Sequence, residues 1–439
     1  MIAALLLAVV TSQALPSGRF ERFCSRSATG RTSRGLPCDD LAFFEAFPAS
    51  GSGAGAACAC TNPTGARGET SATVRANSLD CRKNGFTALS GIVPGDIVTC
   101  GSNQPRVEFG ADGVLGVEAW ANFTQTLVRS DELDNAIWTS TEAVTPNQAT
   151  APDNTLTADQ LNDTNGAVQS CTSQVFVTTS ATKHVVWAYV RAGTINQAQL
   201  KLVGAVSSAG DCTATSTTLS GSTWNVLWCI SPAAYAGTLT SVTVSLCVGD
   251  AVGDTGTVMG WRINHQVNAP DLAFPPPSLQ AVAASASTAF ERITFTLPLA
   301  MSATTGSHAA SFVPAWASTA TSSPAIGSGM QLLYYDGSAR AIYAPAPNAG
   351  RFRQFDGAND VERILTAFTA GSTVRPFSAY TGAVTTVGDQ GGSTTGAFDG
   401  TFGTGALTAL SVGGQISTAQ ASCGIVSRVC ADPNPLRCR

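Results

Sequence analysis

The feature that most constrains the fold is a succession of short alternating segments. Between residues 116 and 274, runs of five to nine residues rich in Val, Thr and aromatic side chains are separated by turn residues such as Ala-Gly and Ser-Gly. Successive side chains of a strand point to opposite faces, so this pattern is typical of half-buried strands. Helical segments do not alternate with them, which argues against an α/β fold. The pattern predicts a jelly roll over residues 116–277, with strands at 172–179, 184–192, 198–206, 224–230, 241–249 and 257–263.

Three consecutive prolines mark the next boundary. Pro275–Pro277 cannot lie in a central strand and would act as a stiff spacer. Residues 278–439 resume the strand pattern, and Asp336-Gly337 is a hairpin signal between two apolar runs. Hydrophobic residues make up 44% of the chain, which is enough for packed cores. We therefore predict an all-β chain in which two consecutive antiparallel β-sandwiches follow a small disulfide-rich N-terminal region.

Cysteine usage predicts disulfides formed in an oxidising compartment. The 13 cysteines are dispersed and no pair has C-x-x-C spacing, which disfavours zinc-ribbon and thioredoxin-like interpretations. Residues 17–115 are predicted to be a stapled attachment region with β-hairpins, and the last residues a stapled C-terminal clip. The odd total implies a free thiol or an intermolecular bridge. The disulfide candidates are Cys24, Cys38, Cys58, Cys60, Cys81, Cys100, Cys171, Cys212, Cys229, Cys247, Cys423, Cys430 and Cys438.

The N-terminus favours secretion. Met1–Ala14 is an apolar run that ends in small residues, which predicts a signal peptide over residues 1–16. A buried N-terminal element of an assembled particle is the alternative. The run is too short to span a bilayer. The net charge of −5, without a Lys/Arg cluster, argues against nucleic acid as a partner. We expect an extracellular protein, on a cell surface or a virion, without a transmembrane span.

Several short motifs resemble a module of bacteriophage tail-fibre and head-spike proteins and of some bacterial surface proteins. The Leu-Gly segment departs from that module because its Glu comes two residues early. The matching segments are Ser71-Ala72-Thr73, Asn103-Gln104-Pro105-Arg106, Leu115-Gly116-Val117-Glu118, Ser130-Asp131-Glu132, Asn135-Ala136-Ile137-Trp138 and Ala151–Asp159. The resemblance implies a jelly roll like that of carbohydrate-binding modules over residues 116–277.

The C-terminal unit is similar to laminin-G and concanavalin-like sandwiches. The similarity lies in the YYDG turn at residues 334–337, the LTALSVGG segment at 407–414 and the run Gly424–Cys430. It implies a laminin-G/concanavalin-like domain over residues 278–439 with a stapled C-terminus. Neither resemblance fixes a ligand, because fold does not imply function.

Catalytic signatures are missing from the sequence. The chain has three histidines, and no H-E-x-x-H, G-x-S-x-G or P-loop motif occurs. We expect His184 and His265 to be surface or half-buried residues. A glycosidase needs only two carboxylates, and no sequence pattern pairs any two of the acids here. The chain is therefore predicted not to be an enzyme.

Calcium is the ion best suited to the acidic loops, because it takes several oxygen ligands. Ordinary turn chemistry is the alternative interpretation, since Asp and Asn favour turns. The candidate ligands are Asp131, Asp134 and Asp153 in the jelly roll, and Asp356, Asn359, Asp360 and Asp389 in the second sandwich.

Sugars are bound by aromatic faces with polar groups nearby, and most aromatic side chains of a sandwich belong to its core. Trp187 and Tyr189 share one face of their strand, and Trp224 is the best solvent-facing candidate because it follows a turn. The candidate ligand-binding residues are Trp224, Trp187, Tyr189, Tyr335 and Tyr343. We expect adhesion or recognition of surface glycans or of a receptor, with self-assembly or docking to a larger particle or cell surface. A structural particle protein without a sugar ligand and a polysaccharide-degrading enzyme are the alternatives.

Overall fold

The computed structural model of the 439-residue chain is all-β, and every regular element among its described residues is a strand. No described helix is long and apolar enough to cross a membrane. Residues 1–16, predicted as a signal peptide, lie outside the described part. The structure describes residues 43–46, 69–73, 80–82, 97–99, 107–110, 113–119 and 124–432 with gaps at 236–238, 268–271, 273–274, 277, 288–291, 297–299, 320–329, 336–339, 345–349, 365, 399, 403–406, 408 and 414–423, and it describes Cys438.

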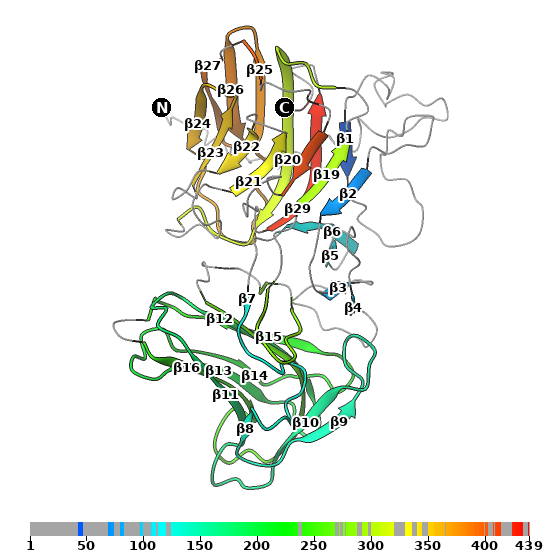
Figure 1. Cartoon of the computed structure of the whole chain (residues 1–439), viewed down its shortest axis with the longest axis vertical. Coiled ribbons are helices and arrows are strands. Elements are labelled where there is room, and N and C mark those ends of the chain that lie inside the picture. The colour runs from blue at the N-terminus through cyan, green and yellow to red at the C-terminus, as the bar shows by residue number, and fades with distance from the viewer. Residues whose placement is uncertain are drawn as a thin grey trace, which may run out of the picture.

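The middle of the chain forms a jelly roll of two five-stranded antiparallel sheets (Figure 1). All six strands predicted between residues 172 and 263 are present within a few residues of their expected bounds. The first sheet has the order β14 (Cys212–Ser216), β13 (Ala198–Gly204), β16 (Ser241–Val248), β11 (Cys171–Val177) and β8 (Thr139–Ser140). The second has the order β15 (Asn225–Ile230), β12 (Val185–Ala192), β17 (Gly256–Gln266), β10 (Ala158–Asp163) and β9 (Thr145–Ala149).

Alternation decides which side chains fill the jelly roll. Val186, Ala188 and Val190 of β12 point inward and pack with Leu200 and Leu246 of the opposite sheet, all at most 2% exposed. These side chains are removed from water, which supplies most of the stabilisation of such a core. Because successive side chains of a strand point to opposite faces, the residues between them on β12 lie on the other face of the same sheet.

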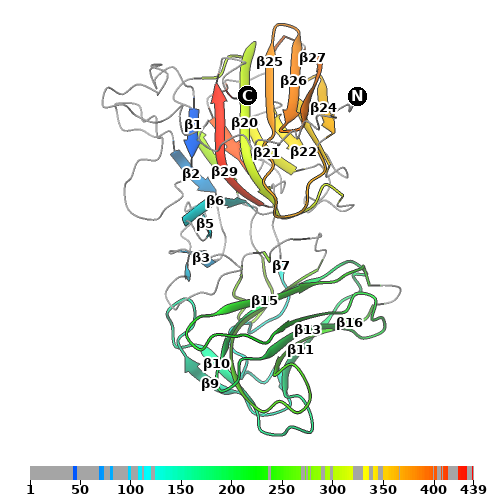
Figure 2. The same ribbon diagram turned by 180° about the vertical axis from the view of Figure 1, so that it is seen from behind.

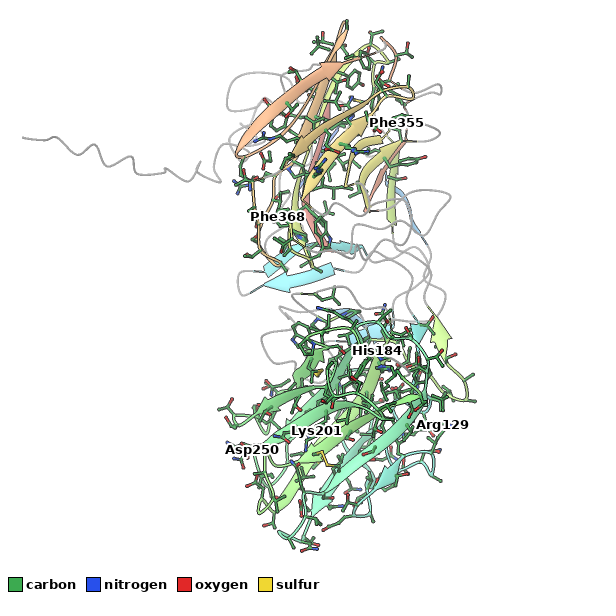
Figure 3. All side chains as sticks on the ribbon, turned by 90° about the vertical axis from the view of Figure 1, so that its left-hand side faces the viewer. Arg129, His184, Lys201, Asp250, Phe355 and Phe368 are labelled. Carbon is green, nitrogen blue, oxygen red and sulfur yellow. A yellow bond between two sulfur atoms is a disulfide. The ribbon has the colours of Figure 1, made fainter. Side chains whose placement is uncertain are left out.

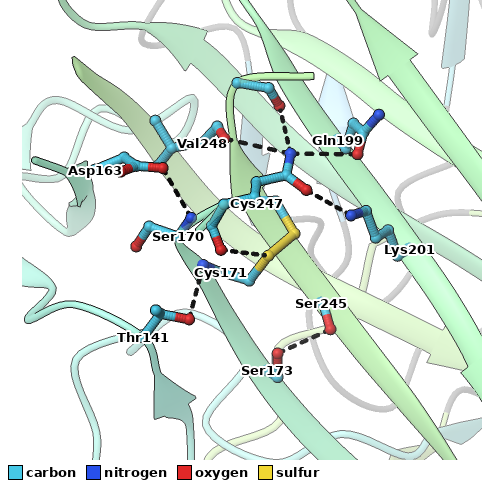
Figure 4. Close-up of a disulfide and its surroundings, with 12 residues drawn as sticks. Thr141, Asp163, Ser170, Cys171, Ser173, Gln199, Lys201, Ser245, Cys247 and Val248 are labelled. Atoms are coloured by element: carbon cyan, nitrogen blue, oxygen red, sulfur yellow. Dashed lines mark hydrogen bonds between the residues drawn. A yellow bond between two sulfur atoms is a disulfide. The ribbon is translucent and has the colours of Figure 1, made fainter. Parts of the chain in front are cut away.

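Two disulfides reinforce the jelly roll. Cys171 and Cys247 face each other on neighbouring strands of the first sheet, beside Lys201 and Gln199 (Figure 4). The second disulfide joins Cys212 on β14 to Cys229 on β15, which are edge strands of different sheets. It closes one side of the sandwich.

The C-terminal sandwich is built from a seven-stranded and an eight-stranded sheet (Figures 1 and 2). The strand pair around Asp336-Gly337 is present as β21 and β22. The first sheet comprises β2 (Glu69–Thr73), β19 (Arg292–Thr296), β28 (Ala409–Val412), β21 (Met330–Tyr335), β22 (Arg340–Ala344), β23 (Arg351–Phe355) and β24 (Asp360–Ile364). The second comprises β27 (Gly392–Ala397), β26 (Val384–Asp389), β25 (Phe377–Thr381), β20 (Thr305–Pro314), β29 (Gly424–Asp432), β6 (Gly113–Ala119) and β5 (Val107–Gly110), with β1 (Phe43–Ala46) also pairing with β29.

The predicted N-terminal region 17–115 is not a separate unit in its described strands. β1 and β6 both pair with β29, and β2 pairs with β19. The jelly roll is thus inserted between strands of one sandwich rather than following an independent module. Only the small hairpin of β3 (Asp80–Arg82) and β4 (Ile97–Thr99) forms a sheet of its own. The paired strands are more than 200 residues apart in the sequence, and such pairing leaves no local sequence signal.

The boundary between the two sandwiches also differs from the predicted 277/278. β18 (Ala286–Ser287) pairs with β7 (Thr124–Gln125) at the entrance of the jelly roll. Residues 278–281 bond to the jelly roll, since the Leu279 amide donates to Asn264 Oδ1 at 2.7 Å and the Ala281 amide donates to Ser130 Oγ at 3.0 Å. The chain therefore still contacts the jelly roll after the proline segment, at residues 278–281.

The C-terminal clip is confirmed for two of its three cysteines. Cys430 of β29 is bonded to Cys438, and the Cys438 amide donates to Ser307 Oγ at 3.2 Å. Both cysteines pack against Ala309, and Phe377 lies beside this small cluster. The last described residue is therefore held on β20. Cys24, Cys38, Cys58, Cys60, Cys100 and Cys423 lie outside the described residues, as does the side chain of Cys81.

Candidate ligand-binding site

The aromatic candidates gather on the outer face of the second jelly-roll sheet. Trp187 and Tyr189 share one face of β12, as predicted, and point away from the main core. The ring of Tyr189 lies 5.2 Å from that of Trp261 on β17. Trp224, just before β15, belongs to the same cluster. This face holds four of the largest fully buried side chains among the described residues, Trp187, Trp224, Trp261 and Tyr189.

These rings are covered, so the prediction that Trp224 faces solvent is wrong. Trp224 is 0% exposed, and Trp187 and Tyr189 are each 1% exposed. The Trp224 indole donates to the carbonyl of Thr150 at 3.2 Å, in a segment that crosses the face. A sugar cannot stack on rings that other parts of the chain already cover.

A second segment covers the other end of the face. Ser278 Oγ accepts from the Trp187 indole at 3.2 Å and donates to Tyr189 Oη at 3.0 Å. Beside it, Trp228 and Ile230 of β15 pack against the core of the C-terminal sandwich. The aromatic face therefore serves as an internal packing surface along most of β12.

A β-bulge gives this face a buried ion pair. Arg262 has a φ of 48°, and the pairing of β12 with β17 shifts register next to it. The bulge turns its guanidinium toward Asp131, with Nε and Nη2 at 3.0 and 2.8 Å from the two carboxylate oxygens. The guanidinium also lies 4.0 Å from the centroid of Trp261. Asp131 holds the pKa of the buried Arg262 above its usual range despite desolvation.

Arg191 is the polar group at the open end of the aromatic face. Its guanidinium carbon lies 5.1 Å from the centroid of Trp224, and the side chain is half-buried. The amide of the next residue, Ala192, donates to the carbonyl of Ser220 at 3.0 Å, which places the following loop beside it. We call Arg191, Trp224 and the loop of residues 220–223 the Arg191 rim.

The two jelly-roll histidines are fully buried, contrary to prediction. His184 Nε2 faces the carbonyl of Ser180 at 3.1 Å and therefore donates, which makes His184 Nδ1 the acceptor for His265 Nε2 at 3.1 Å. His265 Nδ1 then accepts from the Thr126 hydroxyl. Burial lowers the pKa of both histidines, so the relay is neutral (Figure 3 labels His184). It connects the segment before β12 with β17 and with Thr126.

Most of the acidic candidates for calcium binding are engaged by neighbouring groups. Asp131 pairs with Arg262, and Asp153 accepts from the Thr155 amide at 3.0 Å. Asp356 accepts from the amides of Ala358 and Asn359, at 2.9 and 2.6 Å.

The remaining acids are dispersed. Asp360 lies 3.6 Å from Arg353, Asp389 accepts from the Thr366 amide at 2.9 Å, and Asp134 is exposed. Among the described residues, no group of three His, Cys, Asp or Glu side chains could hold a metal ion. The turn interpretation thus accounts for Asp153 and Asp356.

The two aromatic candidates of the C-terminal sandwich are Tyr335 and Tyr343. Tyr335 is 0% exposed, and its hydroxyl lies 2.8 Å from His308 Nε2, inside the sandwich core. Tyr343 is a residue of β22, and its side chain is outside the described part. Tyr335 is therefore a core residue, contrary to the prediction that it binds ligand.

Comparison with known proteins returns similar folds at low identity. No family model and no curated sequence matches the chain. The enzymatically active domain of tailspike protein 4 from bacteriophage CBA120 is similar at 12% identity and a TM-score of 0.26, over 33% of this chain and 21% of that chain. The CBM22-1-CBM22-2 tandem domain of Paenibacillus barcinonensis Xyn10C is similar at 11% identity and a TM-score of 0.26, over 71% of this chain and 98% of that chain. Domains LG4-5 of the mouse laminin alpha1 chain are similar at 9% identity and a TM-score of 0.21, over 62% of this chain and 89% of that chain.

Proposed function

We propose that the chain is a non-catalytic extracellular recognition protein that binds surface glycans or a glycan-bearing receptor, in the manner of a phage fibre or bacterial surface protein. Three described disulfides support an oxidising environment. The observation that carries the proposal is the Arg191 rim. It combines a half-buried guanidinium with a loop that carries an exposed serine, Ser222, at the end of an aromatic face, and guanidinium and hydroxyl groups are the chemistry that binds sugar acids and hydroxyls.

The test is a glycan array probed with the folded protein in calcium and again in a chelator. Binding to a defined set of sugars is expected. Analysis of the bound glycans after incubation separates recognition from hydrolysis, because a polysaccharide-degrading enzyme would shorten them. A blank array with folded protein would contradict the proposal.

Assembly into a larger particle or onto a cell surface is a second role, favoured by a different surface. Val175, Val177 and Val203 are 60%, 78% and 43% exposed on the outer face of the first sheet. Val175 and Val203 both lie opposite Thr243, so they belong to one cross-strand row. Exposed apolar side chains that gather in this way mark interaction surfaces. Light scattering of the wild type and of V177E would show whether this face mediates association.

A further inference from the structure

Arg191 carries a positive charge that the described structure leaves without a countercharge. Its Nε atom is buried and has no hydrogen-bond partner. No ion pair joins Arg191 to any acidic side chain in the described part of the chain. Burial lowers the pKa of this guanidinium, as expected for a cation that loses water without gaining a partner.

Arg262, Arg129 and Lys201, three other basic side chains of the jelly roll, each have a polar side-chain partner. Arg262 makes a two-point contact with Asp131, at 3.0 and 2.8 Å. Arg129, which is labelled in Figure 3, pairs with Glu132 at 3.1 Å. Lys201 donates to Gln169 at 2.6 Å. The Nε atom of Arg191, in contrast, is buried without a hydrogen-bond partner, which costs free energy that an acidic ligand could recover.

Two features prepare the Arg191 rim for a ligand. Trp224 is fully buried and fixed by its bond to Thr150, so the ring under the guanidinium is rigid. The loop beside Arg191 carries Ser222, which is exposed, and Gly221, around which a Cβ atom would meet nothing within 4 Å. The rim thus offers a held cation, hydroxyl groups and free space together.

From these contacts we infer that Arg191 anchors a carboxylate-bearing sugar of the glycan, with the hydroxyl loop at residues 220–223 beside the sugar ring. A guanidinium carries the opposite charge to a carboxylate and can contact it at two points in one plane, as Arg262 and Asp131 do in the same domain. The inference rests on the proposed function and names the ligand class of its site.

The experiment compares the affinity of the protein for acidic sugars with its affinity for their uncharged methyl esters. The probes are galacturonate oligosaccharides, hyaluronan oligosaccharides and sialyllactose, each measured by titration calorimetry beside its carboxyl methyl ester. The wild type should bind at least one acid form about tenfold or more tightly than the ester, since hydrogen bonds to charged groups contribute about that factor. This preference should weaken at high salt. The three probes distinguish uronic acids from sialic acid as the source of the carboxylate.

Variants then assign the preference to one side chain. R191Q should lose it, and R191K should keep part of it because the charge remains without the planar fork. R129Q is the matched control, since it removes an equal charge from the same domain at a residue that has its own acid partner. Near-UV circular dichroism checks that the packing of Trp224 survives. If R191Q does not fold, the acid and ester comparison on R191K and the wild type decides, because a preference unchanged in folded R191K would contradict the role of the planar guanidinium.

The outcomes separate the two proposals. Equal binding of acid and ester forms, or an R191Q protein that is folded and keeps the preference, would overturn the role of Arg191 while leaving glycan recognition intact. A folded wild type that binds no glycan on the array would overturn both.

Discussion

His308 allows a quantitative test of the C-terminal core. It is 0% exposed between the sheets, where its ring stacks on Tyr380 and lies 5.6 Å from that of Phe402. Nε2 lies 2.8 Å from Tyr335 Oη, and Nδ1 lies 3.3 Å from Ser378 Oγ. No carboxylate contacts the ring in the described structure. Burial lowers the pKa of His308 to about 3.

The sign of the pH effect follows from proton uptake. An unfolded histidine titrates near pH 6.5, so between about pH 6.5 and 3 the unfolded state binds a proton that the folded state does not. The free energy of unfolding therefore decreases as the pH falls, by about 1.4 kcal/mol per unit. From pH 7 to pH 5, His308 alone should lower it by about 2 kcal/mol.

Two measurements check this prediction. In the NMR spectrum of histidine-labelled protein, three ring signals are expected, and that of His308 should not move between pH 7.5 and 5. Denaturant-dependent hydrogen exchange of β20 and β25 should show the loss of stability in the wild type, and it should be smaller by about 2 kcal/mol in H308Q.

Hydrogen exchange of β20 and β25 is measured, rather than the stability of the whole chain, because titrating groups of the jelly roll also change its stability with pH. Its two histidines act with the same sign, whereas burial raises the pKa of Asp159 to about 6, so that carboxyl group favours folding as the pH falls. These contributions are common to the wild type and H308Q and cancel between them. A His308 signal with a midpoint near pH 6.5, or equal pH dependence of the two proteins, would refute the reasoning.

Further predictions concern the jelly roll. D131N should destabilise it by about 3–5 kcal/mol because Arg262 stays buried without its partner, and D131M/R262M should recover much of this in urea unfolding. Replacing Cys212 and Cys229 by serine should cost about 2–4 kcal/mol, and a midpoint equal to that of the wild type would contradict the closure of the sandwich by this bond. The calcium site at the predicted acids stays a prediction, and melting curves in calcium and in a chelator test it: a rise of the melting temperature in calcium that D153N abolishes would support the site, and no rise would favour the turn interpretation.

The strands of the jelly roll could be predicted because their signal is local. Val and aromatic residues mark β12, and Val and Leu alternating with Ser and Thr mark β16, and each strand has one face in a core. β27 was not predicted, since its sequence GSTTGA has no large apolar residue. The pairing of β1 and β6 with β29 could not be predicted, because it depends on contacts between segments hundreds of residues apart.

The candidate site was harder to predict for a related reason. Alternation states that Trp187 and Tyr189 share a face, but it does not state what lies on that face. Residues 149–158 and 278–281 cover it, and neither segment is adjacent to β12 in the chain. Arg191 had no sequence signal at all, because an unpaired charge is recognised only when its surroundings are known. Folding topology therefore decided which of the candidate residues a ligand can reach.

The buried ring of Trp224 and the guanidinium of Arg191, both in the Arg191 rim, should respond to mutation in opposite ways. W224A should destabilise the jelly roll by about 3–5 kcal/mol, because it removes a large buried ring. R191Q removes a half-buried charge without a described partner, so its effect on stability should be small while its effect on acidic sugars is large. Measuring unfolding and sugar binding for both variants tests this separation. If R191Q lost stability as W224A does and bound sugars unchanged, the guanidinium would be part of the packing, and the rim would have no role in recognition.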